Sequence, residues 1–217
     1  MDNQTIQVST VSEEVYKQLK ERIITGVLAP GQRVTVRDLA QSMGVSTMPV
    51  RESLRKLEVE GFIIYQRRSV SVARLSAQEV AEIFEIRKQL EGTAIRWSIG
   101  HVTKERINKL EIILEQMDDC LADETAWERL NKLFHLTLYG YADSQPLHDT
   151  LRQIWQRVEP YMHLYALTTR EYSLEKAQED HYQMIHLWKN KEEAALVALI
   201  EEHLAKTCKD IFLQFNQ

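Results

Sequence analysis

The sequence predicts a mainly α-helical protein, in which an N-terminal winged helix-turn-helix precedes a C-terminal all-α antiparallel helical bundle. Glycine and proline become sparse beyond residue 73, where long helix-forming segments follow one another. Apolar residues recur there at helical spacing, without an alternating strand pattern. A short β-rich stretch runs only from Phe62 to Val72. We therefore expect two domains, at residues 1–74 and 75–217.

The composition is that of a chain with a buried core. Of its 217 residues, 44% are apolar and 27% charged, and the formal net charge is −5. This excludes wholesale disorder. The longest uninterrupted apolar run, residues 194–200, is far shorter than the about 20 residues of a membrane-spanning helix. The N-terminal residues lack the basic and apolar segments of a secretory signal. We therefore expect a cytoplasmic protein with no membrane contact.

The N-terminal domain has the spacing of a helix-turn-helix. Helices are expected at about residues 12–25 and 36–43, followed by a third helix that the Ser46 side chain can cap. Pro49 falls in the first turn of this third helix, where a missing N–H is tolerated. Ala40 lets the two later helices cross closely, Gly44 makes the turn between them, and Val50 docks the second of the pair.

The third helix and the hairpin after it present groups suited to DNA. Thr47, Arg51 and Arg55 lie opposite the apolar stripe, and an arginine can pair bidentately with guanine in the major groove. Residues 62–65 and 70–72 can pair as a hairpin, which would place Arg67 and Arg68 on phosphate or in the minor groove. Taken singly, these arginines could be solvated surface charges. Their ordered combination with the helix-turn-helix favours DNA binding.

The C-terminal domain is expected to begin at a capping-box pattern, Ser76 to Glu79. Amphipathic helices follow at about residues 77–99, 104–122, 125–141, 145–168, 174–189 and 191–214. Pro160 should kink or interrupt the fourth of them. Helices without strands indicate an antiparallel bundle.

Four bundle residues form a candidate site for a divalent metal. His181 and His203 lie within apolar stripes, and at matched height if their helices form an antiparallel hairpin. Asn131 and His135 share a face of a third helix and could complete a set of four ligands. Three imidazoles favour zinc or nickel. The alternative is that these residues are hydrogen-bonded core groups. Surface or packing roles are expected for His101, His148 and His163.

Arg87 lies in the middle of an apolar stripe, with Glu91 one turn further along the helix. Burying a guanidinium is costly unless it is paired. Two roles stay open: an internal pair with Glu91, or a cation that faces a ligand cavity and holds a carboxylate. Trp155 and Tyr165 are candidates for lining such a cavity, although aromatic residues at helical spacing are also common in plain cores.

Beyond these patterns, the chain resembles a known family in segments 30–34, 39–40, 44–57 and 60–63, including the run Pro49-Val50-Arg51-Glu52-Ser53-Leu54. These segments resemble the DNA-binding domain of the GntR family of bacterial transcription regulators. The helical remainder is similar to the FCD effector domain of its FadR subfamily. The DNA contacts implied by this resemblance are Arg37, Thr47, Arg51, Arg67 and Arg68, and we add Ser46 from the start of the third helix.

The resemblance also bears on the bundle. FCD domains commonly bind a divalent metal through an acidic residue, a histidine four positions later and two further histidines, and these correspond to Asn131, His135, His181 and His203. Asn131 stands where an aspartate is usual, so the site would have a weaker, neutral donor. FCD domains also show an Arg-x-x-x-Glu at the place of Arg87.

These inferences predict a ligand-responsive DNA-binding transcriptional regulator, for which we expect repression although the sequence itself does not give the sign of regulation. It would bind a near-palindromic double-stranded DNA operator as a homodimer and respond to a small organic acid bound in the bundle. One alternative is a metal-free bundle that binds an apolar effector or only dimerises. Another is a metal hydrolase, but the chain has no H-E-x-x-H, nucleophile elbow or phosphate loop. We therefore do not expect an enzyme.

Overall fold

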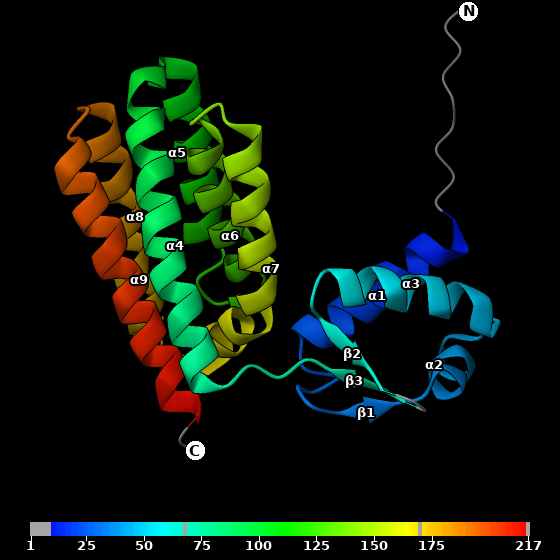
Figure 1. Cartoon of the computed structure of the whole chain (residues 1–217). Coiled ribbons are helices and arrows are strands. Elements are labelled where there is room, and N and C mark those ends of the chain that lie inside the picture. Colours follow the sequence, from blue (N-terminus) through cyan, green and yellow to red (C-terminus); the bar gives the residue numbers. More distant parts are fainter. Residues whose placement is uncertain (1–9, 67–68, 169–170, 216–217) are drawn as a thin grey trace, which may run out of the picture. The chain divides into compact units, whose positions relative to one another are not determined.

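The computed structural model describes residues 10–66, 69–168 and 171–215, except for the side chains of residues 164–168, 171–173 and 214–215. The chain divides into two compact units between Arg74 and Leu75. Each unit has its own apolar core. The predicted fold class, a winged helix-turn-helix followed by an all-helical bundle, is confirmed (Figure 1).

The N-terminal unit contains three helices and a small antiparallel sheet in its described part. Its elements are α1 (Val11–Ile24), β1 (Arg33–Val34), α2 (Val36–Met43), α3 (Thr47–Val59), β2 (Ile63–Tyr65) and β3 (Val70–Val72). The strand order is β1-β3-β2, so the predicted hairpin is present. Strand β1 was not expected, because two residues are too short to show an alternating pattern.

The turn between α2 and α3 follows the predicted spacing. Gly44 ends α2 in the left-handed region, with φ of +65°, while Ala40 and Val50 are buried. Ser46 occupies the N-cap position of α3, but its side chain makes no capping hydrogen bond, so the expected cap is wrong. Pro49 explains this, because it stands three residues after Ser46 and lacks the N–H that such a cap would bind.

The C-terminal unit is a bundle of long helices. They are α4 (Ala77–Ser98), α5 (Lys104–Asp118), α6 (Glu124–Gly140), α7 (Gln145–Thr168), α8 (Glu171–Lys189) and α9 (Glu193–Phe215), with a short 3₁₀ turn at Ile99–His101. The predicted capping box at the start of α4 is present. Helix α4 lies against α9, α6 against α7, and α8 against α9 (Figure 1). Among the described helices, none is long and apolar enough to cross a membrane.

Helix α7 continues through Pro160 without a break, so of the predicted kink or interruption the interruption does not occur. The buried side chains of Val158, Tyr161 and Met162 lie on both sides of the proline. Their packing anchors the helix against the core before and after the missing N–H, which offsets the lost hydrogen bond.

Candidate functional site

The candidate DNA-contacting residues that the structure describes lie on the exposed side of α2, α3 and the hairpin. Arg37, near the start of α2, and Arg51 of α3 line a hollow of about 330 Å³ together with Tyr65 and residues 66, 69 and 70 of the hairpin. Ser46 and Thr47 are exposed at the N-terminus of α3. The predicted contacts at residues 67 and 68 lie outside the described residues.

Tyr65 is a member of this surface that the sequence did not single out. It lines a second hollow of about 250 Å³ together with Arg51, Arg55 and Glu58. Burial and, after it, Glu58 raise the pKa of the Tyr65 phenol, so the phenol stays protonated and can donate a hydrogen bond. A strand tyrosine beside a turn gives no distinct sequence signal.

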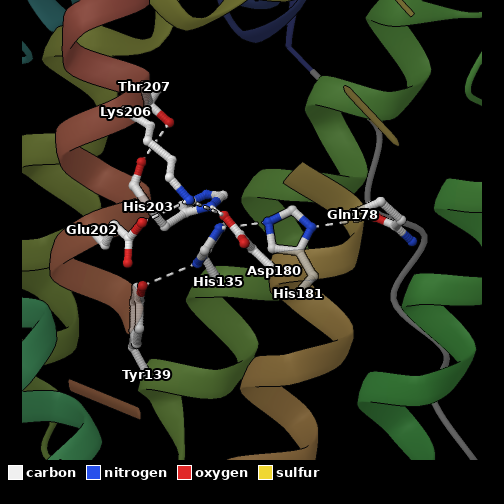
Figure 2. A network of polar contacts seen from close by, with 9 residues as sticks. All are labelled: His135, Tyr139, Gln178, Asp180, His181, Glu202, His203, Lys206 and Thr207. Atoms are coloured by element: carbon white, nitrogen blue, oxygen red, sulfur yellow. Dashed lines mark hydrogen bonds and ion pairs between the residues drawn. The ribbon is translucent and has the colours of Figure 1, made fainter. Parts of the chain in front are cut away.

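The three candidate histidines meet in the interior of the bundle. Figure 2 shows the rings of His135 from α6, His181 from α8 and His203 from α9 turned toward one another. All three are buried, and their candidate ligand nitrogens lie within 4.8 Å of one another. Nε2 of His135 is 3.2 Å from Nε2 of His181. Counting helical rise had predicted matched height for His181 and His203, and the structure brings these two rings to a centroid separation of 5.0 Å.

Hydrogen bonds determine which nitrogen of His135 and of His203 carries the proton. The Tyr139 hydroxyl donates to Glu91 at 2.5 Å, so its oxygen accepts from Nδ1 of His135 at 3.0 Å. Nδ1 of His203 lies 3.1 Å from the Asp180 carboxylate, which can only accept. In both rings the proton therefore belongs on Nδ1, which leaves a lone pair on Nε2.

The side-chain amide of Gln178 places the proton of His181 on Nδ1 in the same way. The Gln178 side-chain nitrogen donates to the Leu114 carbonyl at 3.0 Å and to Asp118 at 2.9 Å. Its oxygen therefore accepts from Nδ1 of His181 at 3.3 Å. All three Nε2 lone pairs consequently face one small buried space. Lone pairs that face one another repel each other unless a cation or a proton occupies the space between them.

A divalent metal fits this donor set. Asn131 lies one turn before His135 on α6, and its Oδ1 is buried with no hydrogen-bond partner among the described residues. Two nitrogens bound tetrahedrally to zinc at about 2.05 Å lie about 3.3 Å apart. The separation of 3.2 Å between the Nε2 atoms of His135 and His181 agrees with this value. Three imidazoles with an amide oxygen suit zinc or nickel.

The electrostatics of the cluster favour neutral imidazoles at His135 and His181. Burial, then His181, His203 and Arg87, lower the pKa of His135 well below its usual value. Burial and His203 lower the pKa of His181 in the same direction. The neutral ring is the form that binds a metal. Burial and Glu91 raise the pKa of Tyr139 well above its usual value, so its phenol keeps the proton that it donates to Glu91.

Arg87 forms the internal pair with Glu91, the first of the two roles that the sequence left open. Its Nε donates to Glu91 at 2.7 Å, and both side chains are buried. Its Nη1 is also buried but has no hydrogen-bond partner among the described residues. Trp155 stacks on the guanidinium at 4.0 Å and donates its indole N–H to Glu91, so only its ring face can contact a ligand. The side chain of the predicted lining residue Tyr165 lies outside the described residues.

Several residues that position the cluster escaped the sequence analysis. Tyr139 carried a signal, because it lies one turn after His135 on the same face of α6. Asp180 carried none: it precedes His181 in sequence but reaches His203 across the α8–α9 contact. Gln178 gave a weak signal, three positions before His181, where a helix brings side chains together.

Comparisons with known proteins agree with this architecture. Residues 82–206 match the family model described as "FCD domain", and residues 11–72 match "Bacterial regulatory proteins, gntR family". The chain is 29% identical over 204 residues to the uncharacterized HTH-type transcriptional regulator YdhC of Bacillus subtilis, covering 91% of this chain and 89% of that protein. It is 24% identical to the HTH-type transcriptional regulator McbR of Escherichia coli, covering 94% of each.

Solved structures show the same fold. The Escherichia coli structure named McbR/YncC superposes with a TM-score of 0.81 at 22% identity, over 96% of this chain and 100% of that one. A transcriptional regulator from Rhodococcus superposes with a TM-score of 0.76 at 18% identity, over 94% of this chain and 98% of the other. Since the FCD model alone spans more than half of the sequence, the chain belongs to the GntR family of bacterial regulatory proteins, with a C-terminal FCD domain, and is a DNA-binding transcriptional regulator rather than an enzyme.

Proposed function

We propose that this regulator is a repressor whose bundle senses a small organic acid through a bound divalent metal. One observation carries the proposal: the lone pairs of His135, His181 and His203 face one buried space beside the unpartnered Oδ1 of Asn131. A cluster built only for packing gains nothing from three lone pairs that face each other.

The three histidines would hold the ion, zinc or nickel, with Asn131 as a fourth donor. When bound, the ion supplies a +2 charge that attracts an anionic ligand. All four protein donors are neutral, so nothing among them compensates this charge. The site therefore favours a carboxylate over a neutral effector.

Arg87 would hold the same carboxylate. Glu91 and the face of Trp155 fix the plane of its guanidinium, and the unpartnered Nη1 remains able to donate a charge-assisted hydrogen bond. Because Glu91 also accepts from Tyr139, the network links the anion-binding group to the positioning of His135. Ligand and metal would thus be sensed by one connected set of side chains on α4, α6 and α7.

The sign of regulation is proposed from the relatives. One of them, 26% identical over 197 residues, is named "Gluconate operon transcriptional repressor" in Bacillus subtilis. A second, from Escherichia coli, is named "HTH-type transcriptional repressor RspR". We infer a repressor that acts in the cytoplasm, where a bacterial operator is found.

We also propose a homodimer on a near-palindromic double-stranded operator. Ile86 and Trp97 are half exposed on α4, and a second copy of the bundle could cover these apolar side chains. The two N-terminal DNA-binding units of the dimer would then contact two half-sites about one turn of DNA apart. The distance between these two units would vary among conformations of the dimer. Effector binding would shift the population between conformations that match the operator and those that do not.

A metal-free bundle is the second candidate. The 3.2 Å between the Nε2 atoms of His135 and His181 also suits a hydrogen bond, if one ring carries its proton there. The bundle would then bind an apolar effector or serve dimerisation alone. In this metal-free state, His135 or His181 would carry its proton on Nε2 and would no longer donate from Nδ1 to Tyr139 or Gln178.

Metal analysis of the purified full-length protein tests the proposal. We expect one divalent ion per chain in the wild type and none after His181→Ala. His186→Ala serves as the matched control, because His186 is exposed on the same helix. In fluorescence-anisotropy titrations, His181→Ala should keep its basal affinity for operator DNA and lose its response to carboxylates. Metal-free protein that still responds fully would establish the second candidate.

A further inference from the structure

We propose that the effector is a carboxylic acid that carries hydroxyl groups, recognised by Glu159, His163 and Trp127 beyond the Arg87 end of the site. The inference rests on the proposed function, because it assumes that Arg87 holds a carboxylate. It adds the chemistry of the rest of the ligand. The argument starts from buried polar atoms that the protein does not satisfy.

Several buried polar atoms in the described part of the bundle have no hydrogen-bond partner. Folded proteins keep few such atoms, and each one indicates a missing partner such as a ligand or a water. The unpartnered atoms used in this inference are Arg87 Nη1, Trp127 Nε1, Asn131 Oδ1, Glu159 Oε2 and His163 Nδ1. All five residues are more than nine-tenths buried.

Three residues arrange part of this set along α7. Trp155, Glu159 and His163 follow each other at intervals of four and therefore share a face of the helix. Trp155 is the residue that stacks on Arg87. At ~1.5 Å per residue, Glu159 lies roughly 6 Å along the axis from Trp155, and His163 roughly 12 Å. A chain of about five or six carbons whose carboxylate is at Arg87 spans the first of these distances.

Helix α6 supplies the opposite wall. An ion pair between Lys132 and Oε1 of Glu159 sets α6 against α7 at this level. Asn131 is the neighbour of Lys132 in sequence, and Trp127 lies one turn earlier with its ring 6.0 Å from that of His181. Trp127 on α6 therefore borders the histidine cluster, and Glu159 lies one turn along α7 from Trp155, whose ring is 5.6 Å from that of His135.

The atoms demand a ligand group that both donates and accepts. Glu159 Oε2 can only accept a hydrogen bond, whereas the indole N–H of Trp127 can only donate one. A hydroxyl serves both, and also His163, whichever form that ring takes. A methylene group would leave them buried and unsatisfied. An ammonium could pair with Glu159 but has no lone pair for Trp127.

The test compares matched acids on the zinc-loaded full-length protein by isothermal titration calorimetry. The hydroxylated probes are gluconate, galactonate and threonate. Hexanoate and butyrate have the same chain lengths without the extra hydroxyls, and 6-aminohexanoate carries an ammonium instead. We expect at least one hydroxylated acid to bind about 10-fold or more tightly than its unsubstituted counterpart, in line with the cost of unsatisfied buried groups.

Variants assign that preference to residues. Glu159→Met should abolish the advantage of the hydroxylated acid and leave the affinity for hexanoate unchanged. Glu179→Met is the matched control, because Glu179 is exposed on α8. If Glu159→Met fails to fold, His163→Phe carries the same expectation, with His148→Phe on the same helix as its control.

Each result is decisive. Equal or tighter binding of hexanoate would overturn the hydroxyl inference while leaving the carboxylate sensor intact. Tighter binding of 6-aminohexanoate would overturn it in favour of an amino acid. If none of these acids binds, both the inference and the proposed carboxylate effector are wrong.

Discussion

The hydroxyl oxygen of Tyr139 lies 3.0 Å from Nδ1 of His135, one turn away on α6, and the same hydroxyl donates to Glu91 on α4. This contact orients the imidazole so that Nε2 faces His181 and His203. Partners of this kind behind a metal ligand typically change metal affinity 10- to 100-fold when they are removed.

Tyr139→Phe should therefore weaken zinc binding by about 10-fold or more, because His135 loses the acceptor that holds its proton on Nδ1. Competition against a chromophoric chelator measures the affinity. Tyr141→Phe is the control, since Tyr141 is a half-buried tyrosine that stacks on Trp188 instead. Unchanged zinc affinity in Tyr139→Phe would show that the phenol does not position His135.

Asn131→Asp should tighten metal binding and weaken the anionic effector. A carboxylate is a stronger donor than an amide oxygen, but it also cancels part of the charge that attracts a second carboxylate. Chelator competition and effector titration of the same preparation separate the two effects. If both affinities rise together, the effector does not approach the metal.

Glu91→Gln should destabilise the bundle strongly. Glu91 is completely buried and accepts from Arg87, Tyr139 and Trp155. Breaking a buried pair of this kind costs about 3–5 kcal/mol, which corresponds to a fall in Tm of roughly 10 °C in a domain of this size. Glu85→Gln provides the contrast, because Glu85 is exposed in its pair with Lys88 on the same helix and should matter by less than about 1 kcal/mol. Calorimetry should therefore separate the two variants clearly.

Arg51→Ala should weaken operator binding by more than about 1 kcal/mol, since a bidentate arginine–guanine contact contributes about 1–3 kcal/mol. Gel-shift titrations at matched salt measure it. Lys17→Ala removes an equal charge from the exposed side of α1 and should have a smaller effect. Equal losses in both variants would mean that Arg51 contributes only charge.

Replacing Arg67 and Arg68 together by alanine should act differently. Loss of phosphate contacts lowers the salt dependence of binding, by about one unit of slope per contact. The readout is the slope of log affinity against log salt concentration on operator and on unrelated DNA. An unchanged slope would show that Arg67 and Arg68 do not contact the DNA backbone.

Local patterns predicted most of the fold. The left-handed conformation of Gly44 and the burial of Ala40 and Val50 could be predicted, because the spacing of these residues in the sequence is that of a helix-turn-helix. The continuity of α7 through Pro160 could not be predicted, because the packing of the residues around the proline decides it. Ser46 failed as a side-chain cap because of Pro49, a conflict visible in the sequence once both positions are assigned.

The candidate site, like the fold, could be predicted from the sequence only in part. Helical rise predicted that His181 and His203 would be level, because both residues lie at countable distances from one turn. The contact of Asp180 with His203 depends on how two helices rotate about their axes. The same holds for the unpartnered oxygen of Glu159, since spacing shows that Glu159 and His163 share a face but not that the face is internal.

The hydroxyl of Tyr161 lies 2.6 Å from the backbone nitrogen of Leu75 and 3.4 Å from its carbonyl oxygen. Leu75 is the second-last residue before α4, and Tyr161 lies on α7 between Glu159 and His163. The phenol therefore ties α7 to the segment of chain that joins the helical bundle to the DNA-binding unit. A rotation of α7 about its axis would therefore move Leu75, the first residue of the C-terminal unit, through this hydrogen bond.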